Sequence, residues 1–230
     1  MAQQERAIRT REKILIAAAE VFDEVGYDAA TISEILKRSG VTKGALYFHF
    51  AAKEELAQEV LAGQVMAMPA VPPRELTLQQ AADEALLLAH LLNSGDPMVR
   101  GSIRLTVDQG ADRDGLDRRV PMQAWVDRGV IALEKAKADG ELLPHTDPAA
   151  LAKLIVGCFT GVQVLSNIMT KHQDMPERVS DLYRTLMTAV AVPGVLVQLD
   201  FRPERGAQVY EEAMALRHGA GASTAEASIR

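Results

Sequence analysis

Residues 31–50 read TISEILKRSGVTKGALYFHF, and this stretch decides how the N-terminal part of the chain folds. Thr31 followed three residues later by Glu34 is the capping-box pattern that starts a helix. Ser39 and Gly40 then turn the chain, and Thr42 can cap a second short helix. Two short capped helices joined by a glycine-containing turn predict a helix-turn-helix motif.

Apolar spacing indicates how these two helices pack on a preceding helix, which we expect over residues 6–25 with Gly26 as its stop. The residues expected to face that helix are Ile32, Ile35, Leu36, Val41, Leu46 and Phe50. We expect Phe48 to be a core aromatic as well. This packing leaves the start of the second short helix exposed, where a recognition helix reaches base edges in the major groove.

The candidates for DNA contact on and beside this helix are Thr42, Lys43, Gly44, Ala45, Tyr47, His49 and Lys53. Thr42 and Ala45 carry methyl groups suited to thymine, and Lys43 can reach guanine acceptors. Tyr47 and His49 carry donors suited to phosphate, and Lys53 stands at a helix N-terminus, which favours an anion. Each residue alone also fits a solvated surface or a core position; their spacing behind a capped turn favours DNA contact.

Charge is distributed unevenly along the 230 residues, which carry a net charge of −6 and a pI near 5.4. Residues 1–53 hold eight Lys and Arg against seven Asp and Glu, whereas the remainder holds 17 against 24. The basic residues of the first part gather in two places: Arg6, Arg9, Arg11 and Lys13, and then Lys37, Arg38, Lys43 and Lys53. Such local patches fit either phosphate binding or a solvated helix surface.

Composition narrows the class of protein. Apolar residues make up 48% and charged residues 24%, which is typical of a globular chain. No apolar run approaches ~18 residues, so we expect no membrane-spanning helix. The N-terminus lacks an apolar leader core, and the lone Cys158 cannot form an internal disulfide, so we expect a cytoplasmic protein.

Spacings of three and four dominate the rest of the chain, so we predict an all-α protein. Expected helices cover 52–65, 77–93, 97–108, 119–139, 147–171, 176–191 and 203–217, with a further short helix at Pro193. Three prolines within 67–75 predict a domain boundary. The expected organisation is therefore a helix-turn-helix domain (1–66), a larger helical ligand-binding and dimerisation domain (67–217) and a flexible tail (218–230).

The segments 147–171 and 176–191 each carry an apolar stripe suited to burial, broad in the first and narrower in the second. Two adjacent helices of this kind favour a four-helix interface between two copies of the chain, so we expect a homodimer. Burial of both helices within one monomer core is the alternative.

Residues 1–66 resemble the DNA-binding domain of TetR-family transcriptional regulators. The matching residues are Phe22, Gly26, Thr31, Ile35, Gly40, Val41, Thr42, Gly44, Leu46, Tyr47, Phe50 and Lys53. The stretches GVTKGALYFHFAAKEEL, LDRRVPMQAW, GELLPH, AVAVPGVLVQLD and ERGA are similar to the γ-butyrolactone autoregulator receptors of filamentous bacteria. The resemblance implies a homodimeric repressor of a pseudo-palindromic operator in double-stranded DNA. It also implies that Arg6 and Arg9 lie near the DNA backbone.

The resemblance implies a small lactone-type effector held by Trp125, Thr160 and Gln64. The lone Trp125 offers a flat apolar wall and one N–H donor, which suits an amphiphile, although a lone tryptophan is more often a core residue. Thr160 alternatively bonds the carbonyl one turn back, Gln64 is alternatively exposed, and Gln163 is a weaker candidate for the same role.

Neither a metal-ligand spacing, a phosphate loop nor a nucleophile with an evident base occurs in the sequence, so we expect no metal, no cofactor and no enzymatic activity. Three alternatives stay open. The fold can sense an antibiotic, furan, butenolide or fatty-acyl compound instead; the helical domain can be an enzyme; or the chain can be a helical interaction module that never binds DNA.

Overall fold

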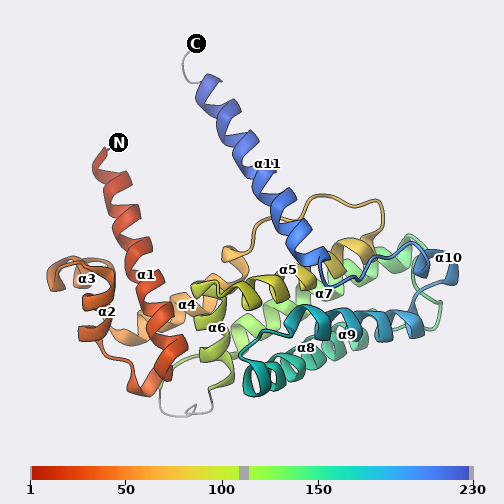
Figure 1. Ribbon diagram of the computed structural model, residues 1–230, viewed down its shortest axis with the longest axis horizontal. Coiled ribbons are helices and arrows are strands. Elements are labelled where there is room, and N and C mark those ends of the chain that lie inside the picture. Colours follow the sequence, from red (N-terminus) through yellow and green to blue (C-terminus); the bar gives the residue numbers. More distant parts are fainter. Residues whose placement is uncertain (1, 109–113, 228–230) are drawn as a thin grey trace. The chain divides into compact units, whose positions relative to one another are not determined.

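The computed structural model describes the backbone of residues 2–108 and 114–227 and the side chains of residues 4–63, 68–108 and 114–217 (Figure 1). These ranges form helices and no strand, which confirms the all-α prediction. The helices are α1 (Ala2–Ala29), α2 (Ile32–Ser39), α3 (Lys43–His49), α4 (Lys53–Ala67), α5 (Thr77–Ser94), α6 (Pro97–Val107), α7 (Arg119–Ala138), α8 (Pro148–Thr170), α9 (Met175–Val190), α10 (Pro193–Leu196) and α11 (Arg205–Ala227).

The chain divides into two compact units. Unit 1 comprises Met1–Ala67 and Gly95–Met122, and unit 2 comprises Met68–Ser94 and Gln123–Arg230. We expected everything after residue 66 to belong to the second domain, so the placement of α6 differs from that expectation. α6 packs against α1 and α4 instead of joining the helices that follow it.

A glycine explains why α6 belongs to unit 1. At Gly101 of α6, an added Cβ would overlap the backbone of Ala19 in α1, so the two helices cross with no side chain between them. Leu105 of α6 is fully buried in the same core as Phe22 of α1 and Leu61 of α4. Such close packing excludes water from the apolar surface of all three helices.

The two short helices of unit 1 begin as predicted. The Thr31 side chain accepts a hydrogen bond from Glu34 N at 3.2 Å, and the Thr42 side chain accepts one from Ala45 N at 3.2 Å. Gly40 ends α2 with a left-handed φ of 66°, a conformation that glycine adopts without steric cost. Regular geometry in α1 is interrupted at Gly26 (φ 74°), the expected stop.

Unit 2 is built around α5, whose Leu78, Leu86, Leu87 and Leu92 are buried. α9 and α11 both pack on α5, and α8 packs on α9. The buried carboxylate of Glu141, in the turn after α7, accepts hydrogen bonds from the first two amides of α5, Thr77 N at 2.8 Å and Leu78 N at 2.7 Å. An anion at a helix N-terminus satisfies donors that have no partner inside the helix.

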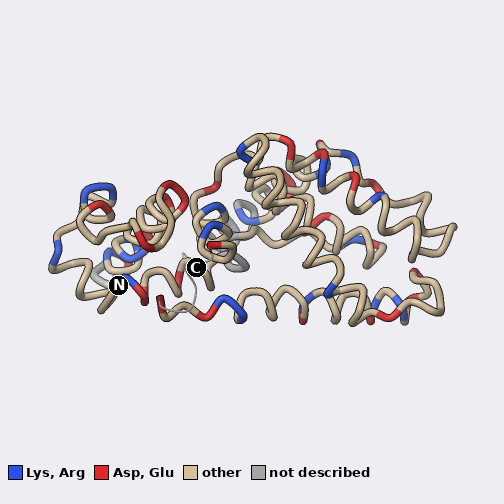
Figure 2. The backbone as a smooth tube through the Cα atoms, turned by 90° about the horizontal axis from the view of Figure 1, so that it is seen from below, with Lys and Arg blue, Asp and Glu red and all other residues tan. Residues whose placement is uncertain are grey.

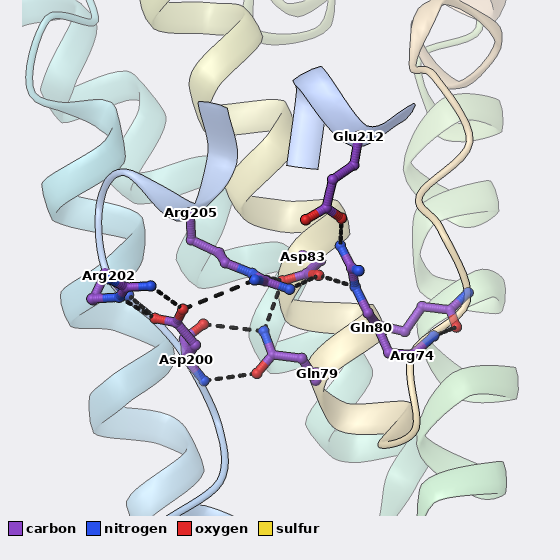
Figure 3. Close-up of polar contacts among 8 residues, drawn as sticks. All are labelled: Arg74, Gln79, Gln80, Asp83, Asp200, Arg202, Arg205 and Glu212. Atoms are coloured by element: carbon purple, nitrogen blue, oxygen red, sulfur yellow. Dashed lines mark hydrogen bonds and ion pairs between the residues drawn. The ribbon is translucent and has the colours of Figure 1, made fainter. Parts of the chain in front are cut away.

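A polar cluster centred on Asp83 joins three segments of unit 2 (Figure 3). The fully buried carboxylate of Asp83 accepts from Arg74 Nε at 2.5 Å, from Arg205 Nη2 at 2.7 Å and from Gln79 Nε2 at 2.7 Å. Arg74 also donates to Glu212 of α11 at 2.6 Å. Because a buried charge is costly unless paired, these bonds fix the linker before α5 and the start of α11 together.

A second cluster closes the turn between α8 and α9. Asp174 accepts hydrogen bonds from the hydroxyls of Ser166 and Thr170 and from Arg178 Nε. Burial raises the pKa of Asp174, but the three hydrogen bonds together outweigh burial and lower the pKa to about 2. The ionised carboxylate therefore stabilises this turn.

The C-terminal helix is longer than expected. We placed its end at residue 217 with a flexible tail beyond, but α11 runs through Ala227 as a helix. Four alanines within 218–227 explain the extension, since alanine is the best helix former and the two glycines there are single interruptions. Residues 228–230 lie outside the described residues.

α8 exposes large apolar side chains that a helix enclosed in a monomer core would bury. Leu154, Val164, Leu165, Ile168 and Met169 are exposed in the single chain, with Ile168 at 68% and Met169 at 65%. The alternative in which one monomer core encloses α8 is therefore wrong. By length and composition α8 is also apolar enough to cross a membrane, so the expectation of no such helix was too strict. That expectation considered only uninterrupted apolar runs. Isolated polar residues interrupt such a run but lower the mean hydropathy of the helix only slightly.

Candidate nucleic-acid interface and ligand site

The face of α3 that points away from the core carries most of the predicted DNA contacts. Leu46 and Phe50 are buried in unit 1, which orients the helix. Thr42, Lys43 and Gly44 are consequently exposed at its start, whereas Ala45 is half-buried. The exposed N-terminal turn is the part of a recognition helix that approaches bases.

Lys43 and Tyr47 form a pair on this face. The two residues are four apart, so they stack one turn above the other. The Lys43 ammonium nitrogen lies 5.9 Å from the centroid of the Tyr47 ring, within the range of a cation–π interaction, and Tyr47 is 46% exposed. The pair presents a positive charge and a phenolic hydroxyl side by side, two groups that bind phosphate or guanine acceptors.

Phe48 is where the structure contradicts the sequence-based expectation. We expected a core aromatic, but its side chain is 80% exposed. Helical geometry gives the reason: at 100° per residue, position 48 points away from both Leu46 and Phe50, which already occupy the core. We call the surface formed by Lys43, Gly44, Tyr47 and Phe48 the recognition face.

The other two candidates near α3 are more constrained. His49 is half-buried, and its ring packs edge to face against Phe48 with 5.1 Å between centroids. The Lys53 ammonium donates to Tyr27 O at 2.8 Å and to Ala30 O at 3.0 Å, and lies 4.2 Å from the Tyr27 ring centroid. Lys53 thus links the start of α4 to the end of α1. The pattern of charges in the sequence did not predict this positioning role.

Arg6 and Arg9 are both exposed on α1 and line a groove of about 380 Å³. Its other lining residues are Glu5, Thr10, Lys13, Ser39, Gly40 and Val41. The sequence placed Lys13 in the same basic patch as Arg6 and Arg9, and their spacing puts the three on one helix face, but it did not indicate that Ser39 lies opposite them. Figure 2 shows Lys and Arg as well as Asp and Glu scattered over the whole backbone, whereas the lining of this groove holds three cations and one anion.

The three effector-binding candidates are spread over α4, α7 and α8. Trp125 is half-buried on α7, one turn before Gly129, where a Cβ would lie 3.3 Å from Ala152 Cβ of α8. Thr160 is half-buried on α8, and its hydroxyl donates to Val156 O at 2.8 Å. This is the bond to the carbonyl one turn back that was the alternative to a role in effector binding. Gln64 belongs to α4, but its side chain lies outside the described residues. The weaker candidate Gln163 is buried.

Among the side chains that the structure describes, those of residues 4–63, 68–108 and 114–217, no group of three His, Cys, Asp or Glu is able to hold a metal ion.

A capped helix-turn-helix with an exposed recognition face, followed by a helical second unit, defines the class of one-component DNA-binding regulators. The family model described as "Bacterial regulatory proteins, tetR family" matches residues 14–60. The A-factor receptor protein of Streptomyces griseus is 37% identical over 93% of this chain and 76% of its own length. The chain belongs to the TetR family of bacterial transcriptional regulators.

Two solved structures extend the similarity over both units. TylP, a TetR regulator from Streptomyces fradiae, is 63% identical, with a TM-score of 0.86 over 91% of this chain and 99% of its own. A γ-butyrolactone receptor described as ArpA-like is 27% identical, with a TM-score of 0.67 over 90% of this chain and 99% of its own. The resemblance to the autoregulator receptors is thus confirmed along most of the chain, and these relatives are regulators and not enzymes.

Proposed function

We propose that this protein is a cytoplasmic homodimeric repressor that binds a pseudo-palindromic operator and is released by a γ-butyrolactone-like molecule, thereby controlling secondary metabolism. The observation that carries the DNA-binding part is the recognition face: four side-chain positions of one short helix, held outward by the buried Leu46 and Phe50. Small, cationic and aromatic positions on one exposed helical face suit the major groove.

Dimerisation supplies the second recognition helix. Five large apolar side chains of α8 are exposed in the single chain, a patch that water does not favour. A second copy packed on α8 and α9 would bury them and present two recognition faces. The proposed operator has half-sites about 34–36 Å apart, one turn of DNA.

The effector class rests on the relatives. One is named an A-factor receptor and another a γ-butyrolactone receptor. Half-buried Trp125 offers such a lactone an apolar wall. Thr160 offers a hydroxyl oxygen that still accepts a hydrogen bond while its proton is donated to Val156 O. Release requires that the effector bind the DNA-incompetent conformation more tightly, and allosteric couplings are typically ~1–3 kcal/mol.

A gel shift with duplex DNA from upstream of the protein's own gene tests the proposal. Lys43→Ala combined with Tyr47→Ala should abolish the specific complex, because both side chains reach out from the recognition face. Arg217→Ala, an exposed charge change in unit 2, is the matched control. Unaltered binding by the double variant, with the control also unaltered, would show that α3 does not read this DNA.

A further inference from the structure

The last turn of α6 is bonded to the segment of chain that enters the helix-turn-helix. Tyr27 N donates a hydrogen bond to Asp108 Oδ2 at 3.3 Å, directly after the break in α1 at Gly26. Asp108 is the residue at which α6 ends, and a Cβ at Gly26 would lie 2.6 Å from the same carboxylate oxygen, so this close approach requires glycine. The carboxylate therefore fixes the direction in which the chain runs towards Thr31, the cap of α2.

The same turn of α6 is also bonded to the residue that precedes α7. Arg118 Nε donates to Leu105 O at 2.7 Å. Since α6 runs only to Val107, this carbonyl is one of those that a helix leaves without an internal partner. Asp114 accepts from Arg118 Nη2 at 2.5 Å and from Nη1 at 3.1 Å, and the two side chains are only 14% and 4% exposed. This bidentate pair holds the Arg118 guanidinium in one orientation.

Both bonds act on one rigid element. Leu105 and Asp108 are three residues apart, so their positions differ by about 4.5 Å along the helix axis. The backbone crossing with α1 at Gly101 holds the middle of α6, and the last turn lies beyond this point. A displacement of Leu105 O therefore also displaces the Asp108 carboxylate.

We propose that Asp108 and Arg118 are positioning residues that link α7 to the entrance of the helix-turn-helix through the last turn of α6. The inference rests on the proposed function, since α7 begins directly after Arg118 and carries the proposed effector contact Trp125 two helical turns further on. When α7 moves, Arg118 moves Leu105 O, the last turn of α6 follows, and Asp108 loses its bond to Tyr27 N. The chain that enters the helix-turn-helix then has no fixed direction.

Reciprocity makes this link measurable without an effector. If the position of α7 influences operator binding, then operator binding influences the position of α7. Trp125 is the single tryptophan of the chain, so its emission reports the surroundings of α7. Titration of the unmodified protein with duplex DNA from upstream of its gene should change this emission. The anisotropy of a labelled copy of the duplex measures binding in parallel.

Two variants remove the two bonds, and each has a matched control. Asp108→Ala lacks the acceptor, whereas Asp108→Asn retains a carbonyl oxygen that accepts. Arg118→Lys keeps the positive charge but lacks the planar fork that contacts Asp114 and Leu105 O together. Arg119→Lys is the same exchange at the neighbouring residue, whose side chain is 91% exposed. At saturating duplex, Asp108→Ala and Arg118→Lys should lose the change in tryptophan emission, and the two controls should keep it.

An emission change in Asp108→Ala or in Arg118→Lys equal to that of the unmodified protein would overturn the link, because the two bonds act in series. An unmodified protein that binds the duplex with no change in emission, or a loss of the change in either control, would overturn it as well. Because emission is compared at saturation, a variant with weaker binding still gives a result. Should Arg118→Lys fail to fold, the half-buried Asp108 and its two variants decide. Failure of the unmodified protein to bind the upstream duplex would instead contradict the proposed function.

Discussion

Replacing Asp83 by Asn should destabilise unit 2 far more than any surface ion pair would. The carboxylate is fully buried and accepts bonds from Arg74 and Arg205, whose side chains are themselves only 17% and 16% exposed. Asn has the same shape but no charge, so two mostly buried guanidinium groups lose the buried counter-ion that they share. Arg74 keeps only the more exposed Glu212, and Arg205 keeps only Asp200 at 4.0 Å. Breaking a buried pair in this way costs about 3–5 kcal/mol. At about 2–4 °C per kcal/mol, the thermal midpoint should fall by about 6–20 °C.

The single tryptophan makes the measurement specific. Trp125 lies in unit 2, so its fluorescence during heating reports the unfolding of the unit that contains Asp83. Asp181→Asn is the control, because Asp181 pairs with Arg184 at 3.6 Å with both side chains mostly exposed, and exposed pairs contribute little.

A double-mutant cycle sharpens the prediction. Arg74→Gln combined with Asp83→Asn should lose less stability than the sum of the single variants, because the second change removes a charge that the first left unpaired. Additive losses, or a midpoint for Asp83→Asn within about 2 °C of the unmodified protein, would refute the view that this cluster holds the linker and α11 together.

Three further outcomes are expected. Ile168→Glu should convert a dimer into a monomer near 24.9 kDa in light scattering, whereas Val197→Glu, at a still more exposed apolar position outside α8, should not. Because the pKa of Asp174 is lowered, its stabilising effect should be complete above about pH 4 and disappear as the pH falls towards 2; acid unfolding curves of Asp174→Asn should lack this component. Trp125→Ala should raise the lactone concentration needed to release the operator, without changing operator affinity when no lactone is present; release at an unchanged concentration would exclude Trp125 from the pocket.

Sequence patterns spanning a few residues correctly predicted the helix starts and stops, which depend on interactions within the same few residues. The caps at Thr31 and Thr42 and the stop at Gly26 follow from hydrogen bonds and dihedral angles within a few residues. The exposed position of Phe48 was predictable in the same way, from its angle to Leu46 and Phe50, but hydrophobicity was given more weight than register. The pattern of α8 correctly indicated an apolar helix but not which of its faces is exposed.

Short-range patterns in the sequence predict the helices, the helix-turn-helix and the exposed start of α3, because caps and a 3.6-residue period act over one or two turns. Only the tertiary structure decided that α6 joins the DNA-binding unit through Gly101, that Lys53 is bound to the end of α1, and that Arg74 and Arg205 share Asp83. These contacts join residues far apart in the chain, and their formation depends on how whole helices pack. No short-range pattern in the sequence predicts that packing.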